Sequence, residues 1–191
     1  MGRVQTFETE VAVRAAREVF WQRGFEEASI PELEAATGLR RSSLYNTFGS
    51  KRGLFDAAVR SYLDEVISPR LQPLTSETVH PDAVLEYLRG LRSGLRDAQT
   101  VASQHGCLLM NAAGAPVAQE RAVGDAVAAY REELLRALAS GLAARHPEAS
   151  EAELRRTSEA VTALVTSAFA MTRVDNAAAL RSLDTALELA A

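Results

Sequence analysis

Basic side chains are concentrated between residues 40 and 52 of an otherwise acidic chain. The members of this basic cluster are Arg40, Arg41, Lys51 and Arg52. No acidic residue lies between Glu34 and Asp56, whereas the 191-residue chain has a formal net charge of −4. Because a local concentration of positive charge attracts phosphate groups, the basic cluster predicts a phosphate-binding surface.

The single cysteine, Cys107, is the second group with reactive potential. It follows His105 and Gly106 at the expected start of a short helix, where the helix dipole and a cationic histidine would lower the thiol pKa. The sequence favours a plainer alternative, a small buried side chain packed beside Leu108 and Leu109, because free cysteine is among the most buried residue types. A Cys–His nucleophile is not expected, since His105 and Cys107 point in different directions and no third orienting group is evident.

No metal site or catalytic group is expected elsewhere in the sequence. The histidines His80, His105 and His146 do not have metal-ligand spacing. Neither a glycine-rich phosphate loop nor a nucleophile elbow is present. We therefore expect no catalytic residue, no metal, no cofactor and no enzymatic activity.

The basic cluster lies on a predicted pair of short helices. Ile30 and Leu33 share one face of the first helix. Residues 37–39, Thr-Gly-Leu, form the short glycine-containing turn that is typical of a helix-turn-helix. Leu44 and Phe48, four residues apart, form the buried side of the second helix. The side chains left exposed on the second helix are Arg40, Arg41, Ser42, Ser43, Tyr45, Asn46 and Thr47.

Residues 10–60 resemble the DNA-binding domain of TetR-type (AcrR-like) transcriptional regulators in residue type and in spacing. The matching residues are Phe20, Gly24, Phe25, Ser29, Ile30, Leu33, Gly38, Leu39, Ser43, Leu44, Tyr45, Phe48, Ser50, Lys51 and Leu54. The chain departs from the family pattern at Glu34 and Thr37, where small alanines are usual, and at Asn46-Thr47, which replace a commoner aromatic-histidine pair. The resemblance implies a homodimer that binds a palindromic operator in double-stranded DNA and responds to a small-molecule effector.

The second helix of a helix-turn-helix enters the major groove with its N-terminal residues against the base edges. Arg41, Ser42 and Ser43 are therefore expected to read bases, and Arg41 can form a bidentate contact to guanine. The side chains expected over the flanking phosphates are Lys51, Tyr45, Thr47 and Ser29, the N-cap of the first helix. The full set expected to contact DNA is Ser29, Arg40, Arg41, Ser42, Ser43, Tyr45, Asn46, Thr47 and Lys51.

The whole sequence predicts an all-α fold of about nine helices, because helical spacing of apolar residues recurs and no strand pattern is present. We expect a helix-turn-helix DNA-binding domain over residues 1–54 and a helical effector-binding and dimerisation domain over residues 55–191. A helix from Lys51 that ends before Pro69 is expected to carry the signal between them. A linker rich in Pro, Ser and Thr is expected to follow at residues 68–82.

The sequence also indicates a cellular location. It has no apolar run of the ~18 residues that a membrane span needs, and no signal-peptide core at its start. Its one cysteine allows no internal disulfide. A cytoplasmic protein without a membrane partner is therefore expected.

Two further groups of residues are assigned from helical spacing and from the resemblance. The expected effector-pocket residues are Tyr62, Tyr87, Cys107, Met110, Tyr130 and Phe169. The last two helices carry more apolar and small side chains than one buried face requires, which suits an interface. The resemblance implies that these helices pair with their copies in a dimer through Leu154, Val161, Leu164, Ala168, Leu180, Leu183 and Leu187.

The favoured function is a dimeric transcriptional repressor that is released from its operator by a small-molecule effector or by modification of Cys107. Release would follow a population shift that separates the two recognition helices. The alternative is an all-helical dimeric ligand-binding or scaffold protein whose helix-turn-helix has lost DNA binding, which Glu34 and Asn46-Thr47 leave open. Salt-dependent, sequence-selective DNA binding distinguishes the two hypotheses.

Overall fold

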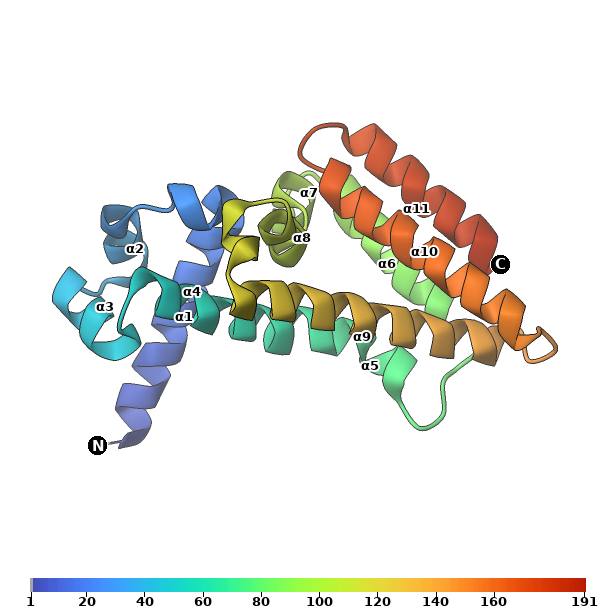
Figure 1. Ribbon diagram of the computed structural model, residues 1–191, viewed down its shortest axis with the longest axis horizontal. Coiled ribbons are helices and arrows are strands. Elements are labelled where there is room, and N and C mark those ends of the chain that lie inside the picture. Colours follow the sequence, from blue (N-terminus) through green and yellow to red (C-terminus); the bar gives the residue numbers. More distant parts are fainter. Residues whose placement is uncertain (1) are drawn as a thin grey trace.

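The computed structural model describes residues 2–191, with the backbone alone for residues 2–8. The elements are α1 (Gly2–Glu27), α2 (Ile30–Thr37), α3 (Arg41–Phe48), α4 (Lys51–Tyr62), a π-helical turn (Leu63–Ile67), α5 (Ser68–Thr75), α6 (Ala83–Arg96), α7 (Val101–His105), α8 (Leu108–Ala113), a 3-10 turn (Pro116–Gln119), α9 (Arg121–Arg145), α10 (Glu151–Met171) and α11 (Asn176–Ala190). Every regular element in this range is helical, so the predicted all-α fold is confirmed. Figure 1 shows α1 to α3 at one end of an elongated molecule and α6, α10 and α11 towards the other.

The three N-terminal helices pack around aromatic side chains. Gly24 interrupts α1 with a φ of 80°, a conformation that favours glycine, and so ends the regular part of the helix. The Phe20 ring packs edge-on against Phe55 with centroids 5.1 Å apart, and Phe25 contacts Phe55 at 5.2 Å. Phe55, which the sequence assigns to the second domain, therefore packs in the core of the first, and the predicted boundary falls inside α4.

A nearly continuous helical rod runs from α4 through the π-helical turn into α5, along one side of α9 (Figure 1). The sequence predicts instead that the helix ends before Pro69 and that residues 68–82 form a linker. The linker prediction is wrong over α5, because Pro69 occupies the first turn of that helix, where its missing N–H is not needed. Leu71 and Leu74 also bury their side chains, which offsets the cost of Pro73 inside the helix.

The C-terminal helices form the far half of the molecule. α10 packs along α11, and α11 also packs on α6, to which an ion pair between Arg92 and Asp184 ties it. α10 begins with a capping box: Ser150 accepts the Glu153 N–H, and the Glu153 carboxylate accepts the Ser150 N–H. Local signals therefore set the start of α10, and apolar burial holds it in place.

Specific polar contacts join the two halves. The Trp21 indole N–H donates to the Gly106 carbonyl over 3.0 Å, and the Val117 N–H donates to the Glu26 carboxylate over 2.8 Å. Trp21 itself is buried. These contacts fix α1 to the turns on either side of α8.

A second set of contacts ties α1 to the π-helical turn. The guanidinium groups of Arg14 and Arg17 both contact Glu65, at 2.9 and 3.0 Å, and Arg17 also donates to Ser61. Burial raises the pKa of Glu65, but the hydrogen bonds and charges of the two arginines outweigh it and lower the pKa. Glu65 is therefore ionised at neutral pH and anchors the rod to α1.

Replacement of Gly106 tests the packing of the turn between α7 and α8. Gly106 has a φ of 70°, and an added Cβ would lie 2.7 Å from the Phe169 carbonyl oxygen, so Gly106→Ala should destabilise the fold by about 1–3 kcal/mol. Gly94→Ala is the matched control, because a Cβ at this position meets nothing within 4 Å. This substitution should stabilise the fold by about 0.5–1 kcal/mol, since alanine favours a helix over glycine. Chemical denaturation measures both changes, and equal stability of the two variants would contradict the packing described for Gly106.

Candidate nucleic-acid interface and ligand pocket

The outer face of α3 is a continuous polar surface at one end of the molecule (Figure 1). Leu44 is buried, and Phe48 is half-buried against the core. The exposed side chains include every α3 residue that the sequence assigns to DNA contact: Arg41, Ser42, Ser43, Tyr45, Asn46 and Thr47, with Arg40 at the N-cap. The arrangement of α2, turn and α3 is thus that of a helix-turn-helix.

Glu34 positions the start of α3. Its carboxylate accepts the Arg41 backbone N–H over 2.6 Å, while the N-cap residue Arg40 makes no side-chain cap. A carboxylate at a helix N-terminus satisfies an otherwise free N–H and suits the helix dipole. Glu34, which departs from the small residues of the TetR pattern, therefore replaces the missing cap of α3, a role that sequence reasoning missed.

The side chains of Arg41 and Tyr45 lie together on the exposed face of α3. The Arg41 guanidinium carbon is 5.5 Å from the centroid of the Tyr45 ring, which is 37% exposed. A cation over an aromatic ring gains about 0.5–1 kcal/mol at an exposed site. This contact orders Arg41 without pairing its charge, so its hydrogen-bond donors remain available to a partner.

Two members of the basic cluster are held by the protein itself. The Lys51 ammonium donates to the Glu26 carbonyl over 3.2 Å and lies 4.8 Å from the centroid of the Phe25 ring. Arg52 is paired with Asp56 and Glu120, so its charge is neutralised and directed towards the body of the molecule. The surface therefore presents fewer free cations than the sequence suggests. The sequence did not reveal the pairing of Arg52 with Glu120, because Glu120 is distant in the chain.

The N-cap predicted at Ser29 is present, and a second serine, Ser50, caps the helix that follows α3. Ser50 accepts the Gly53 N–H at the start of α4 over 3.0 Å. Ser29 forms a capping box with Glu32, accepting the Glu32 N–H and donating its hydroxyl to the Glu32 carboxylate over 2.8 Å. The Ser29 hydroxyl is thus engaged within the protein, and its expected phosphate contact stays a prediction.

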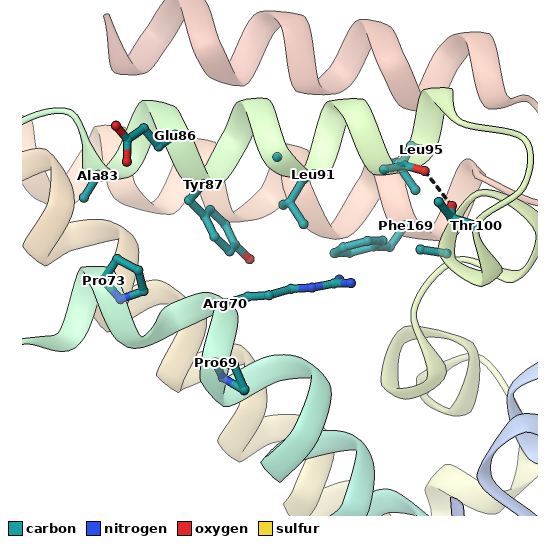
Figure 2. Close-up of a pocket in the computed structure, with 13 residues that line it drawn as sticks. Pro69, Arg70, Pro73, Ala83, Glu86, Tyr87, Leu91, Leu95, Thr100 and Phe169 are labelled. Atoms are coloured by element: carbon teal, nitrogen blue, oxygen red, sulfur yellow. Dashed lines mark hydrogen bonds between the residues drawn. The ribbon is translucent and has the colours of Figure 1, made fainter. Parts of the chain in front are cut away.

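A pocket of about 370 Å³ lies between α5 and α6, closed at one end by Phe169 of α10 (Figure 2). Of the residues that the sequence assigns to an effector pocket, Tyr87 and Phe169 line it. Arg70, Glu86 and Thr100 are lining residues that sequence reasoning missed. Arg70 carries no sequence signal of its own, because it lies in the stretch predicted to be a linker.

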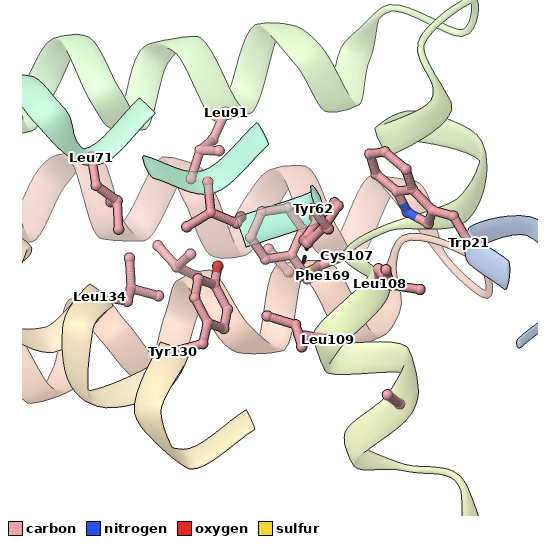
Figure 3. Close-up of a cluster of buried hydrophobic side chains, with 14 of the residues drawn as sticks. Trp21, Tyr62, Leu71, Leu91, Cys107, Leu108, Leu109, Tyr130, Leu134 and Phe169 are labelled. Carbon is pink, nitrogen blue, oxygen red and sulfur yellow. Dashed lines mark hydrogen bonds between the residues drawn. The ribbon is translucent and has the colours of Figure 1, made fainter. Parts of the chain in front are cut away.

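The other predicted effector-pocket residues lie outside this pocket. Tyr62, Cys107 and Tyr130 belong to a buried cluster that shares Leu91 and Phe169 with the pocket wall (Figure 3), and Met110 is half-buried on α8. The assignment of these four to the pocket lining is therefore corrected: packing of α8 against α4 and α9 closes the space around Cys107.

The buried cluster gives Cys107 properties opposite to those of an activated thiol. Cys107 is fully buried, and the Tyr62 hydroxyl donates to its sulfur over 3.4 Å. Burial raises the pKa of the Cys107 thiol more than its hydrogen bonds lower it. Burial, with the charge of Arg173, also lowers the pKa of His105, so the predicted cationic histidine is neutral at pH 7. The plainer alternative, a buried small side chain, describes Cys107 better.

The residues expected at a dimer interface fall into two groups. Val161, Ala168 and Leu183 are buried within the single chain, so the assignment of these three to a surface between copies is corrected. The half-buried residues available to a partner are Leu154, Leu164, Leu180 and Leu187. Beside them, α10 exposes small residues that the sequence analysis did not single out: Ala160, Ala163, Ser167 and Ala170.

Metal-binding groups and membrane-spanning helices were both sought among the described residues. Across the described residues, no group of three or more His, Cys, Asp or Glu side chains is placed to hold a metal ion. No helix in the described range is both long and apolar enough to cross a bilayer.

A helix-turn-helix with an exposed polar second helix, joined to a helical bundle with its own pocket, defines the class of protein. Residues 12–58 match the sequence model described as "Bacterial regulatory proteins, tetR family". This segment of the chain is therefore similar to the helix-turn-helix of TetR-type regulators.

Individual relatives agree with this family. The uncharacterized HTH-type transcriptional regulator YezE of Bacillus subtilis is 33% identical over 113 residues, which cover 59% of this chain and 57% of that protein. The HTH-type transcriptional repressor ComR of Escherichia coli is 31% identical over 111 residues, 58% of this chain and 51% of that protein. The chain thus spans little more than half the length of these relatives.

The likeness to solved structures extends further. A cysteine mutant of the TetR family transcriptional regulator CifR, solved with a 26-base-pair operator DNA, superposes with a TM-score of 0.76 and 28% identity, covering 94% of this chain and 95% of that one. The structure of reduced NemR of E. coli superposes with a TM-score of 0.77 at 17% identity. The superposition covers 96% of this chain and 95% of the NemR chain, so the two share the fold.

Replacement of Glu34 tests its role as the cap of α3. Glu34→Ala leaves the Arg41 N–H without its partner and should lower the free energy of unfolding by about 0.5–2 kcal/mol. Glu34→Gln keeps an acceptor and should lose less. Thermal denaturation followed by circular dichroism measures both, with Glu27→Ala, an exposed residue at the end of α1, as the control. Unchanged stability of Glu34→Ala would contradict the capping role.

Proposed function

We propose that this protein is a dimeric transcriptional repressor that binds a pseudo-palindromic operator through α3. The observation that carries the proposal is α3 itself, which exposes polar donors on its whole outer face inside the segment that matches the family's regulatory domain. The repressor name of ComR and the operator complex of CifR support it.

Each part of the helix-turn-helix has a distinct role in this proposal. Arg41, Ser42 and Ser43, at the N-terminus of α3, meet the base edges, and Arg41 pairs with a guanine. The residues that position the protein through phosphates are Ser29, Arg40, Tyr45, Asn46, Thr47 and Lys51. Lys51 acts from a fixed place, because Phe25 and the Glu26 carbonyl hold its ammonium group at the start of α4.

The dimer forms through α10 and α11. The half-buried leucines on these helices supply apolar area, and the small residues Ala160, Ala163, Ser167 and Ala170 follow one another at intervals of three or four, which puts them on one face of α10. Small side chains on one face let two helices approach closely. Pairing of two copies would place two recognition helices one DNA turn, about 34–36 Å, apart.

An effector in the pocket controls the spacing of the recognition helices. The pocket wall includes α5, which forms one rod with α4 through the π-helical turn, and α4 packs against α3 and α1. A ligand that binds better when the rod has tilted shifts the population to the tilted state. The domain assignment follows this division, with residues 1–54 carrying DNA contacts and residues 55–191 carrying the ligand and the dimer contact.

Modification of Cys107 is a second, slower route to release. The sulfur has no exposed surface and lies against Tyr62 at the end of α4, so an added group must displace that contact. Displacement of Tyr62 would move the same rod that the effector moves. The raised thiol pKa makes this route slow at neutral pH.

Substitutions at the helix-turn-helix test the DNA contacts separately. Arg41→Ala should weaken operator binding by about 1–3 kcal/mol and relax the base preference, because a base contact is lost. Lys51→Ala should weaken binding to all DNA sequences by the same factor. It should also reduce the slope of log affinity against log salt concentration by about one. Fluorescence anisotropy with operator and random DNA across a salt series measures both, with Arg89→Ala on the distant α6 as control.

The operator is sought first in the DNA immediately upstream of the protein's own gene and then by selection from random sequences. If Arg41→Ala leaves the ratio of operator to random affinity unchanged, Arg41 does not read a base. Failure of the random selection as well would favour the ligand-binding or scaffold alternative.

Alkylation tests the route through Cys107. N-Ethylmaleimide should modify the native protein at least about tenfold more slowly than the unfolded chain, and full modification should release the operator. The Cys107→Ser variant should bind the operator, and treatment with N-ethylmaleimide should not change its affinity. Unchanged operator affinity after complete modification of Cys107, checked by mass spectrometry, would rule out this route and leave the pocket ligand alone.

A further inference from the structure

Arg70 places a positive charge in the pocket without a protein partner for it. It lies on α5 between Pro69 and Pro73, and Figure 2 shows its side chain extending along the pocket towards Phe169. No hydrogen bond or ion pair of Arg70 occurs within the described part of the chain, although ion pairs hold Arg14, Arg17, Arg52 and Arg92 there. Its guanidinium therefore keeps all its donors for a molecule in the pocket.

The Tyr87 hydroxyl is the second free polar group. In Figure 2 it points from α6 towards the Arg70 side chain, and no hydrogen bond to it is found among the described residues. The Thr100 hydroxyl is in contrast engaged, because it donates to the Gly94 carbonyl over 2.6 Å. Arg70 and Tyr87 thus supply a cation and a hydroxyl donor that converge inside the pocket.

The rest of the wall is apolar and leaves room for a hydrophobic body. Leu91, Leu95 and Phe169 line the side opposite Arg70 and are buried from bulk water. Gly90 and Gly94 also line it, and a Cβ added at either would meet nothing within 4 Å. The absence of side chains at these two positions of α6 opens the space over the helix.

We propose that the pocket binds an amphipathic monoanion, a carboxylate attached to an apolar body, as the effector of the proposed repressor. The carboxylate pairs with the Arg70 guanidinium in the two-pronged geometry that suits these planar groups, and the Tyr87 hydroxyl donates a further hydrogen bond. The apolar body lies over Gly90 and Gly94 against Leu91, Leu95 and Phe169. The role of this ligand as an effector rests on the proposed function, whereas the chemical class of the ligand follows from the pocket residues alone.

The position of Glu86 argues for one negative charge at one end of the ligand. Figure 2 shows Glu86 beside Ala83, at the end of the pocket away from the Arg70 guanidinium. A dianion that extended to that end would meet like charge. A cationic ligand would have to place its charge at Glu86, away from the Tyr87 hydroxyl and from Phe169, and would leave the Arg70 charge unpaired.

Calorimetry on the full chain tests the ligand class. The probes are straight-chain carboxylates from butanoate to dodecanoate, together with 1-octanol and octylamine as matched neutral and cationic forms of octanoate. We expect at least one carboxylate to bind, the matched alcohol to bind about tenfold more weakly, and the amine not to bind. Arg70→Gln should weaken binding of the carboxylate at least about tenfold and leave binding of the alcohol unchanged. Arg89 is an exposed arginine on α6 that does not line the pocket, so Arg89→Gln should change neither affinity.

Gly90→Ala tests whether the apolar body occupies the space over α6. The variant removes no contact and favours the helix, so it should fold at least as stably as the wild type. It should nevertheless weaken the longest carboxylate several-fold, because the new methyl group fills part of its space. Carboxylate binding that depends on Arg70 but is unchanged by Gly90→Ala would place the apolar body away from the space over α6 and overturn this part of the assignment.

The remaining outcomes separate this inference from the proposed function. Operator binding without ligand should be the same for Arg70→Gln and the wild type, since α5, which carries Arg70, lies away from α3 (Figure 1). Carboxylate binding without any DNA binding would support the ligand class and refute the repressor. Operator binding without binding of any carboxylate, or with equal affinity for octanoate, octanol and octylamine, would refute the ligand class and leave the repressor standing.

Discussion

The contact between Trp21, Tyr62 and the Gly106-Cys107 turn is the joint on which the rest of the structure depends. The indole ring packs edge-on against Tyr62 at 4.9 Å and donates to the Gly106 carbonyl, while the Tyr62 hydroxyl donates to the Cys107 sulfur. Three helices, α1, α4 and α8, are therefore fixed to one another by groups that water does not reach. Buried hydrogen bonds of this kind are costly to break singly, so these helices move together or not at all.

The sequence predicted those features that local signals determine. The Ser29 N-cap depends on residues within one helical turn, and the turn at Gly38 depends on one residue that tolerates positive φ. The helix-turn-helix itself combines such signals over a short stretch. This is why the all-α fold and the exposed face of α3 could be inferred before any tertiary contact was known.

The features that the sequence did not predict depend on distant partners. Arg52 counts as a free cation until α9 brings Glu120 beside it, and Cys107 has an activated thiol only if packing does not remove water from it. The predicted linker is partly helical because α9 buries Leu71 and Leu74. In each case desolvation or pairing across the fold outweighs the local preference, and neither can be read from spacing along the chain.

In the proposed repressor, the same joint would connect a ligand in the pocket with DNA at the far end of the molecule. Arg70 and Tyr62 lie on one rod, at opposite sides of the π-helical turn, and Glu65 within that turn is held by Arg14 and Arg17 of α1. A ligand that draws Arg70 towards Phe169 therefore pulls on an element that cannot bend freely at its middle. The rod is tied to α1 at Glu65 and to α8 through Tyr62, so in the proposed mechanism the pull would be relieved by a joint movement of these elements with the helix-turn-helix. Discrete repacking of such a joint, and not gradual bending, is what gives a repressor two states that an effector can select between.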